Sequence, residues 1–168
     1  MLKTHKPDFL FLSETISVSN KIEELSSRFG FSNYFSVDKK GRAGGLAIFW
    51  KHTMVCEIIE SLQNHIDLIV SENNSVSWRL TCYYGFLERE RHSHAWDFLR
   101  LPASKSQLLW CIIGDFNDLL CGQDKNGRHP HPQSLLNGFK KVVNDCGLSE
   151  IDLSGGSFTW EKSKGTKD

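Results

Sequence analysis

Polar side chains that could do chemistry follow directly after apolar runs in three segments of this sequence. Glu14 closes "FLFLSE", Tyr84 lies in "RLTCYYG", and Asp115 and Asn117 lie in "CIIGDFN". Two carboxylates, a phenol and a carboxamide could together hold a divalent cation, orient a water molecule and stabilise phosphate oxygens. These residue types therefore indicate metal-dependent chemistry on a phosphate group, provided that the fold brings them together.

A sheet in which several strands end at a common edge would bring these four side chains together. Hydrophobic patterning predicts strands at residues 8–13, 33–37, 44–50, 54–62, 65–70, 75–85 and 108–115. It predicts helices around Ile22, Leu25 and Phe29, around Trp96 and Leu99, and around Leu135, Leu136, Phe139, Val142 and Val143. Polar groups at the carboxyl ends of strands in α/β folds converge on one edge of the sheet. We therefore expect the four candidate residues at such an edge.

The bulk composition is that of a soluble globular chain and predicts one domain over residues 1–168. Twenty basic residues balance twenty acidic ones, so net charge neither supports nor excludes a nucleic-acid partner. The five cysteines have no paired zinc spacing and are typical of reduced core thiols. The N-terminal apolar stretch is too short for a membrane span. These features predict an intracellular protein, cytoplasmic or nuclear, without a membrane partner; its oligomeric state is left open.

The same segments resemble the endonuclease/exonuclease/phosphatase superfamily, and more closely the endonuclease domain of plant non-LTR (LINE-type) retrotransposons. The resemblance runs, in the family's order, through "KPDFLFLSET", "GRAGGLAIFW", "WRLTCYYG", "HAWDFLRL", "WCIIGDFNDLL", "NGFKKVVNDCGL" and "GGSFTW". It implies an α/β fold, a four-layer α/β sandwich in which two mixed sheets pack face to face with helices outside. It also implies Mg²⁺-dependent phosphodiester hydrolysis, with Mn²⁺ as a possible substitute and DNA as the partner.

Residue roles also follow from this resemblance. Glu14 matches the metal-binding glutamate, and Tyr84 matches the active-site tyrosine. Asp115 and Asn117 match the catalytic pair that orients the attacking water and binds the scissile phosphate. Thr159 falls where retrotransposon members keep a threonine near the DNA, which makes it a candidate substrate-binding residue.

The resemblance also has gaps. The family's first strand, with an active-site asparagine, would precede Met1, and no segment matches its terminal Asp-His pair. Around the tyrosine, Cys82 and Phe86-Leu87 replace a small residue and a proline. We therefore expect an incomplete domain, truncated at both ends, with reduced or no activity.

Each motif also has a purely structural interpretation. Glu14 could favour the start of the following helix, Asp115 and Asn117 could close the strand in an Asx turn, and Tyr84 could be a half-buried strand aromatic. "RHPHP" at residues 128–132 is more typical of a surface loop than of a metal site, because no third ligand is near. Gly44-Gly45 is followed by no helix and so favours close strand packing over phosphate binding.

These observations favour a retrotransposon endonuclease, associated with a reverse transcriptase, that nicks DNA. Two alternatives remain open at this point. One is a non-catalytic remnant or binding module on the same scaffold. The other is a phosphatase that acts on a phosphorylated lipid or inositol.

Overall fold

The computed structural model describes residues 2–16, 19–41, 44–72, 75–125 and 130–151. The chain divides into two compact units. The first comprises residues 1–87 and 107–117, and the second comprises residues 88–106 and 118–168. A single domain over residues 1–168 stays a prediction.

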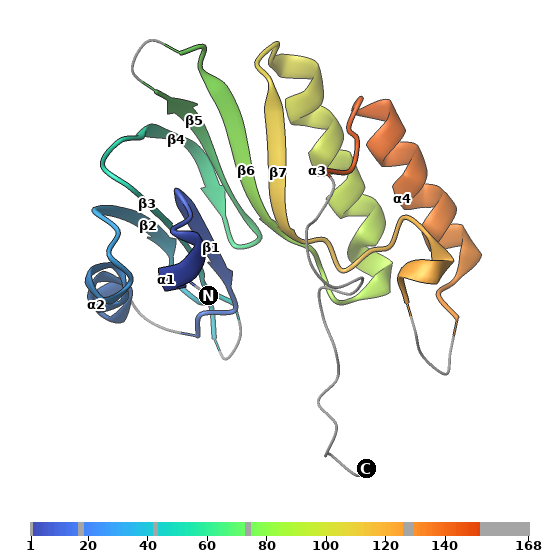
Figure 1. The fold of residues 1–168 in the computed structure, drawn as a ribbon. Helices are drawn as coiled ribbons and strands as arrows, with labels where there is room; N and C mark the ends of the chain where they lie inside the picture. The colour runs from blue at the N-terminus through green and yellow to red at the C-terminus, as the bar shows by residue number, and fades with distance from the viewer. Residues whose placement is uncertain (1, 17–18, 42–43, 73–74, 126–129, 152–168) are drawn as a thin grey trace. The chain divides into compact units, whose positions relative to one another are not determined.

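Two β-sheets form the first unit (Figure 1). Its elements are α1 (Leu2–His5), β1 (Phe9–Ser13), α2 (Ser19–Phe29), β2 (Asn33–Val37), β3 (Leu46–Trp50), β4 (Val55–Leu62), β5 (His65–Ser71), β6 (Trp78–Tyr84) and β7 (Trp110–Asp115). The strand orders are β1-β3-β2 and β4-β5-β6-β7. Every predicted strand is therefore present, whereas the four-residue α1 was not predicted.

The strand directions correct one part of the expected fold. Both pairings in the three-stranded sheet are antiparallel, so this sheet is not mixed in its described strands. The four-stranded sheet is mixed, because β4, β5 and β6 pair antiparallel while β6 and β7 pair parallel. The parallel pair matters for function, since parallel strands end at the same edge.

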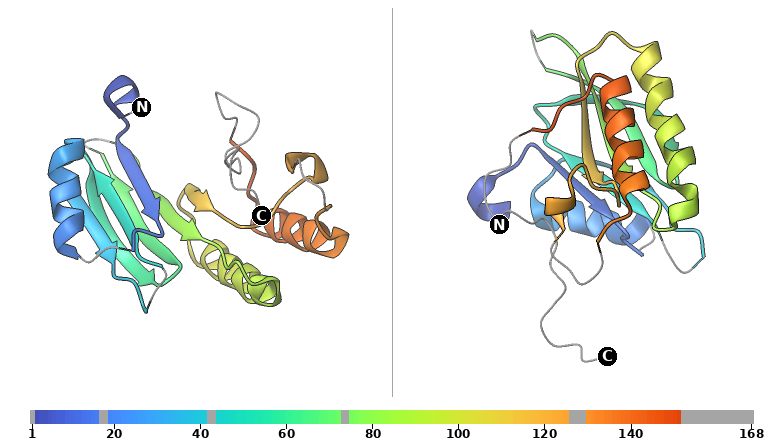
Figure 2. Two further views of the ribbon diagram at one scale, coloured as in Figure 1. Left: turned by 90° about the horizontal axis from the view of Figure 1, so that it is seen from below. Right: turned by 90° about the vertical axis from the view of Figure 1, so that its right-hand side faces the viewer.

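The two sheets of the first unit pack face to face over an apolar core. The buried side chains of this core come from β3, β5 and β6: Leu46, Ile48, Trp50, Ile66, Leu68, Val70, Leu80 and Cys82. β3 is buried along its whole length, which explains its uninterrupted apolar sequence. Its alternate residues Ala47 and Phe49 face the other way, where Ile22 of α2 and Phe31 complete a second cluster. Thus α2 covers the outer face of the three-stranded sheet (Figure 2), and the α/β fold of packed sheets with helices is confirmed.

A buried polar network lies on the face of the four-stranded sheet that is turned away from this core. Arg79 of β6 pairs with Asp67 of β5, and Thr81 donates a hydrogen bond to Asp67 Oδ1 at 2.9 Å. Trp110 of β7 donates from Nε1 to Thr81 Oγ1 at 2.8 Å, and the Arg79 guanidinium lies 5.5 Å from the Trp110 ring centroid. A satisfied buried network specifies one arrangement of its strands. It therefore fixes the register of β5, β6 and β7.

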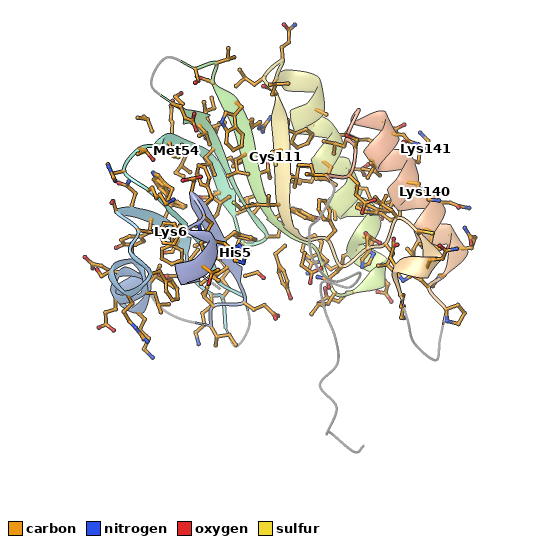
Figure 3. The ribbon with its side chains drawn as sticks, viewed as in Figure 1. His5, Lys6, Met54, Cys111, Lys140 and Lys141 are labelled. Atoms are coloured by element: carbon orange, nitrogen blue, oxygen red, sulfur yellow. The ribbon has the colours of Figure 1, made fainter. Side chains whose placement is uncertain are left out.

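The second unit contains two longer helices, α3 (His92–Lys105) and α4 (Gln133–Asp145), with the short 3₁₀ turns η1 (Arg89–Arg91) and η2 (Gly122–Asp124). The two helices pack side by side (Figure 2). Leu136, Phe139 and Val142 are the buried residues of α4, whereas Lys140 and Lys141 lie on its exposed side (Figure 3). The sequence predicts this apolar stripe correctly. No helix in the described residues is long and apolar enough to cross a membrane.

All five cysteines are free thiols, as their spacing predicts. Cys82 is fully buried, and Cys56 and Cys111 are half-buried and pack against the same core cluster. Figure 3 labels Cys111 on β7. Burial raises the pKa of the Cys56 thiol to about 11 and also raises the pKa of Cys82. These thiols are therefore protonated and weakly reactive at neutral pH.

Candidate active site

Tyr84 and Asp115 meet because their strands run in parallel. β6 and β7 pair in a register that sets Tyr83 opposite Gly114 and Tyr84 opposite Asp115, the last residue of each strand. The Gly85 N–H continues this pairing with a bond of 2.7 Å to the Asp115 carbonyl oxygen. Alternation along β6 turns Tyr84 toward the core between the sheets, where it packs against the buried cluster. The phenol and the carboxylate therefore share one edge of the first unit.

Asn117 is fixed by two hydrogen bonds and an unusual backbone conformation. Its side-chain amide donates to the Gly85 carbonyl oxygen at 2.8 Å, and its backbone N–H donates to Asp115 Oδ1 at 2.9 Å. Its φ of 54° is left-handed, a region that asparagine tolerates better than most residues. Phe116, which lies between Asp115 and Asn117 in the chain, packs its ring against the Tyr83 ring, with the ring centroids 5.2 Å apart. The Asx turn that the sequence allows is therefore present and holds Asn117 beside Tyr84.

Glu14 approaches the edge that carries Tyr84 and Asp115 from the end of β1, in the three-stranded sheet. It lies one residue beyond β1, and β1 approaches β7. Glu14 is exposed and has a φ of 51°, which is uncommon for glutamate. The next two residues anchor this conformation, because Thr15 N–H bonds the Gly45 carbonyl at 3.1 Å and Ile16 N–H bonds the Gly44 carbonyl at 3.2 Å. Gly44 and Gly45 thus serve close packing and hold the Glu14 segment.

The Tyr84 hydroxyl joins the three groups. It hydrogen-bonds the Glu14 carboxylate and the Asn117 amide, and the Asp115 carboxylate is close enough to act on its charge. Burial raises the pKa of Tyr84 most strongly, the bond to Glu14 and the charges of Glu14 and Asp115 raise it further, and Asn117 opposes them. The resulting pKa is about 12. Tyr84 is therefore a neutral hydrogen-bond donor at physiological pH.

The structure thus brings together Glu14, Tyr84, Asp115 and Asn117, which are far apart in the sequence. Glu14 does not cap a helix, because α2 begins only at Ser19. Thr159 lies outside the described residues, as do residues 128 and 129 of the "RHPHP" segment. The roles of all five site residues stay predictions. Sequence reasoning missed Gly85, whose carbonyl orients Asn117; its position directly after Tyr84 was the available signal.

Comparison with known proteins agrees with this arrangement. The model of the Endonuclease/Exonuclease/phosphatase family matches residues 1–165. The chain belongs to this family. Its members are hydrolases, endonucleases and phosphodiesterases among them, and generally use divalent metals. No curated protein sequence matches the chain.

Solved structures share the fold of this endonuclease/exonuclease/phosphatase chain. The AP endonuclease of Leishmania major has a TM-score of 0.60 and 12% identity, over 86% of this chain and 59% of its own. The 3′ phosphatase NExo from Neisseria, bound to a product DNA hairpin, has a TM-score of 0.58 and 12% sequence identity. The match covers 86% of this chain and 63% of the NExo chain. An AP endonuclease from Archaeoglobus fulgidus has a TM-score of 0.54 and 17% sequence identity. The match covers 85% of this chain and 62% of that endonuclease. The chain spans about three-fifths of the length of each structure.

The donors at this site are compatible with the divalent metals that members of this family generally use. Among the described residues, no group of three or more His, Cys, Asp or Glu side chains is arranged to hold a metal ion. Mg²⁺ commonly uses one or two carboxylates and completes its coordination with water and substrate phosphate. The exposed carboxylates of Glu14 and Asp115, both near the Tyr84 hydroxyl, meet that requirement.

Tyr84 should remain un-ionised where an ordinary tyrosine begins to lose its proton. Because its folded pKa is raised, its contribution to stability is complete below the unfolded pKa of about 10 and is lost as pH rises through about 12. In a spectrophotometric titration between about pH 9 and 11, near the ordinary tyrosine pKa, we expect Tyr84→Phe to have the same phenolate signal as the unmodified chain. A clear loss of phenolate signal in Tyr84→Phe would show that Tyr84 titrates normally.

Proposed function

We propose that this chain hydrolyses DNA phosphodiester bonds with Mg²⁺, as the nicking endonuclease of a non-LTR retrotransposon. The observation that carries the proposal is the convergence on the Tyr84 hydroxyl, which binds the Glu14 carboxylate and the Asn117 amide while the Asp115 charge lies close by. These groups come from both sheets of the first unit. A structural role for each residue separately would not require them to meet.

The chemistry assigns each group a task. Glu14, with Asp115 nearby, would hold the cation, which supplies charge to stabilise phosphate oxygens and the leaving group. Asp115 accepts a hydrogen from an attacking water and orients it. The Asn117 carboxamide donates a hydrogen bond to a phosphate oxygen, where negative charge develops, and the Tyr84 hydroxyl donates its one hydrogen there in place of Glu14 once Glu14 holds the cation. Tyr84 can do so because it keeps its proton at neutral pH.

Two observations favour DNA as the substrate. The fold neighbour from Neisseria is bound to a product DNA hairpin, and two other neighbours are AP endonucleases. The contexts "WCIIGDFND" and "FTW" resemble retrotransposon endonucleases more closely than phosphatases of lipids or inositols. The wider reaction, in which the nick primes reverse transcription, rests on that resemblance.

The test is conversion of supercoiled plasmid to the nicked circle by the purified 168-residue chain, with Mg²⁺, with Mn²⁺ and with EDTA. We expect cation-dependent nicking at a low rate, as the incomplete match to the family's motifs predicts. Glu14→Gln should raise the Mg²⁺ concentration for half-maximal nicking by at least about tenfold, the lower end of the cost of losing even an outer-shell partner of a metal. Glu57→Gln, which changes an exposed carboxylate on β4, is the matched control and should behave as the unmodified chain.

A second measurement tests the cation without turnover. Mn²⁺ should broaden the amide NMR signals of Glu14 and Tyr84 selectively, and Glu14→Gln should remove this broadening. Nicking that persists in EDTA, or equal Mn²⁺ broadening in Glu14→Gln, contradicts the metal assignment. Release of phosphate from an inositol phosphate, without plasmid nicking, would instead support the phosphatase alternative, and binding of DNA without either reaction would support a non-catalytic module.

A further inference from the structure

The polar groups of the candidate site suit a phosphate but do not select the molecule that carries it. They are two carboxylates, a hydroxyl and a carboxamide, from Glu14, Tyr84, Asp115 and Asn117. Such groups bind a cation and phosphate oxygens, and a phosphate is alike on a nucleic acid, a lipid and an inositol. Contacts to phosphate position a nucleic acid, whereas contacts beyond the phosphate specify it. Discrimination among these substrates therefore needs a residue of different chemistry beside the site.

Ile16 is an apolar residue in this place. It lies two residues beyond Glu14, and two residues of chain span at most about 7 Å. Ile16 is nevertheless 56% exposed. Single exposed apolar side chains are common on protein surfaces, so its backbone conformation decides whether stability of the fold explains an isoleucine here.

The backbone of Ile16 is unfavourable for isoleucine. Its φ of 50° is left-handed, and a β-branched residue in this region is a genuine outlier. Glycine or asparagine would adopt this conformation more readily. Ile16 thus has neither the burial nor the backbone preference that would make isoleucine favourable in the folded chain. Strained residues of this kind persist where their surroundings hold them, and they cluster at functional sites.

The loop between β2 and β3 holds Ile16 in this conformation. The Ile16 N–H bonds the Gly44 carbonyl oxygen at 3.2 Å. A Cβ atom at Gly45 would lie 2.5 Å from Thr15 Oγ1, 3.5 Å from the Ile16 nitrogen and 3.6 Å from the Lys39 nitrogen. The loop therefore packs tightly against the segment that follows Glu14, and this packing fixes the position of Ile16.

The same loop places positive charge next to Ile16. Lys39 and Lys40 directly follow Asp38 after β2, and Lys40 is exposed. An apolar side chain beside lysines fits a chain in which anionic phosphates alternate with the apolar surfaces of sugars and bases. An inositol phosphate carries hydroxyl and phosphate groups around its ring and lacks such surfaces. The chemistry beside the site therefore favours a nucleic-acid strand.

We propose that Ile16 is a specificity-determining residue, which packs against the sugar and base of the nucleotide next to the scissile phosphate. This assignment rests on the proposed function, because it places a phosphodiester at the edge that carries Glu14 and Tyr84. Apolar side chains, isoleucine among them, pack against or between bases in several DNA-binding proteins. The exposed surface of Ile16 is then buried only in the complex with substrate, which offsets the unfavourable backbone there.

Thermal unfolding tests whether this side chain serves the fold or the substrate. Ile16→Asn removes the apolar group and supplies a residue that tolerates the left-handed region. We expect it to raise the midpoint of thermal unfolding by about 2–4 °C, the effect of relieving one such residue in a chain of this size. A lower midpoint would show that Ile16 packs to support the fold, and would overturn the inference.

DNA binding is measured without turnover, by fluorescence anisotropy of a labelled duplex in EDTA. Ile16→Asn should raise Kd by about 5- to 10-fold, the effect of no longer burying the exposed half of one isoleucine side chain. Ile16→Leu, which stays apolar, should keep most of the affinity. Val76→Asn changes an 80% exposed residue just before β6, at the end of that strand opposite Tyr84. It is the matched control and should bind as the unmodified chain does.

Plasmid nicking separates recognition of the nucleotide from recognition of the phosphate. In Ile16→Asn, kcat/KM for nicking should fall by the same factor as the affinity for the duplex. The concentration of inorganic phosphate that half-inhibits nicking should stay unchanged, because free phosphate contacts only the polar groups. An equal change in both quantities would show that Ile16 acts on the polar groups, and would overturn the inference.

Two further outcomes distinguish this inference from the proposed function. Normal DNA binding and nicking by Ile16→Asn, or an equal loss in Val76→Asn, overturn the role of Ile16 and leave the nuclease standing. Weaker DNA binding by Ile16→Asn, in a chain that nicks no DNA under any condition, supports the nucleotide contact and contradicts the nuclease.

Discussion

Asp115→Ala is expected to reduce Mg²⁺-dependent nicking by about a hundred- to ten-thousandfold, the usual range for loss of a positioned acid or base. Two losses combine in this variant. The carboxylate that we propose orients the attacking water is removed, and so is the oxygen that accepts the Asn117 N–H at 2.9 Å. The measurement is the initial rate of nicked-circle formation at saturating Mg²⁺.

A second substitution separates these two losses. Asp115→Asn retains an oxygen that can accept the Asn117 N–H and therefore keeps the Asx turn, but it has no negative charge. If the charge is essential, Asp115→Asn should be nearly as slow as Asp115→Ala. Near-normal nicking by Asp115→Asn would show that Asp115 acts only as a turn residue, and the catalytic assignment would be wrong.

Gly114→Ala is expected to destabilise the first unit and to abolish nicking. Gly114 has a φ of 140°, which side-chain-bearing residues rarely adopt, and a Cβ there would lie 1.8 Å from the Tyr83 carbonyl oxygen. Because that oxygen is backbone, β6 and β7 would have to separate at the register that aligns Tyr84 with Asp115. Overpacking and backbone strain together should lower the free energy of unfolding by about 3 kcal/mol, measured by urea denaturation.

Gly41→Ala is the matched control for the backbone conformation. Gly41 also has a left-handed φ, of 72°, but its added Cβ would meet none of the described residues within 4 Å. Its substitution should cost only the conformational strain, about 1–2 kcal/mol, and should leave nicking measurable. Equal losses of stability for the two variants would mean that the approach of β7 to β6 is looser than the structure indicates.

The sequence by itself determines where the elements lie. Within the described residues, hydrophobic patterning locates the seven strands and the three longer helices, because local side-chain periodicity must match the face that each element buries. β3 illustrates this, since its continuous apolar run corresponds to burial on both faces. The sequence also identifies Glu14, Tyr84, Asp115 and Asn117 as polar groups at strand ends, and its order of motifs indicates the family that the family model confirms.

Only the tertiary structure decides what these groups touch. No local pattern reveals that β6 and β7 are parallel neighbours, that Glu14 adopts a left-handed conformation, or that Glu14 reaches the Tyr84 hydroxyl from the other sheet. Nor does it reveal that the Asp118 carboxylate hydrogen-bonds His92 and Trp96 of α3, more than twenty residues earlier in the chain. The physical reason is that an element forms from the sequence of its own faces, whereas hydrogen bonds and charge pairs at a site depend on which elements pack together. The same Asp115 side chain consequently closes a turn and lies beside Tyr84, two roles that the sequence could present only as alternatives.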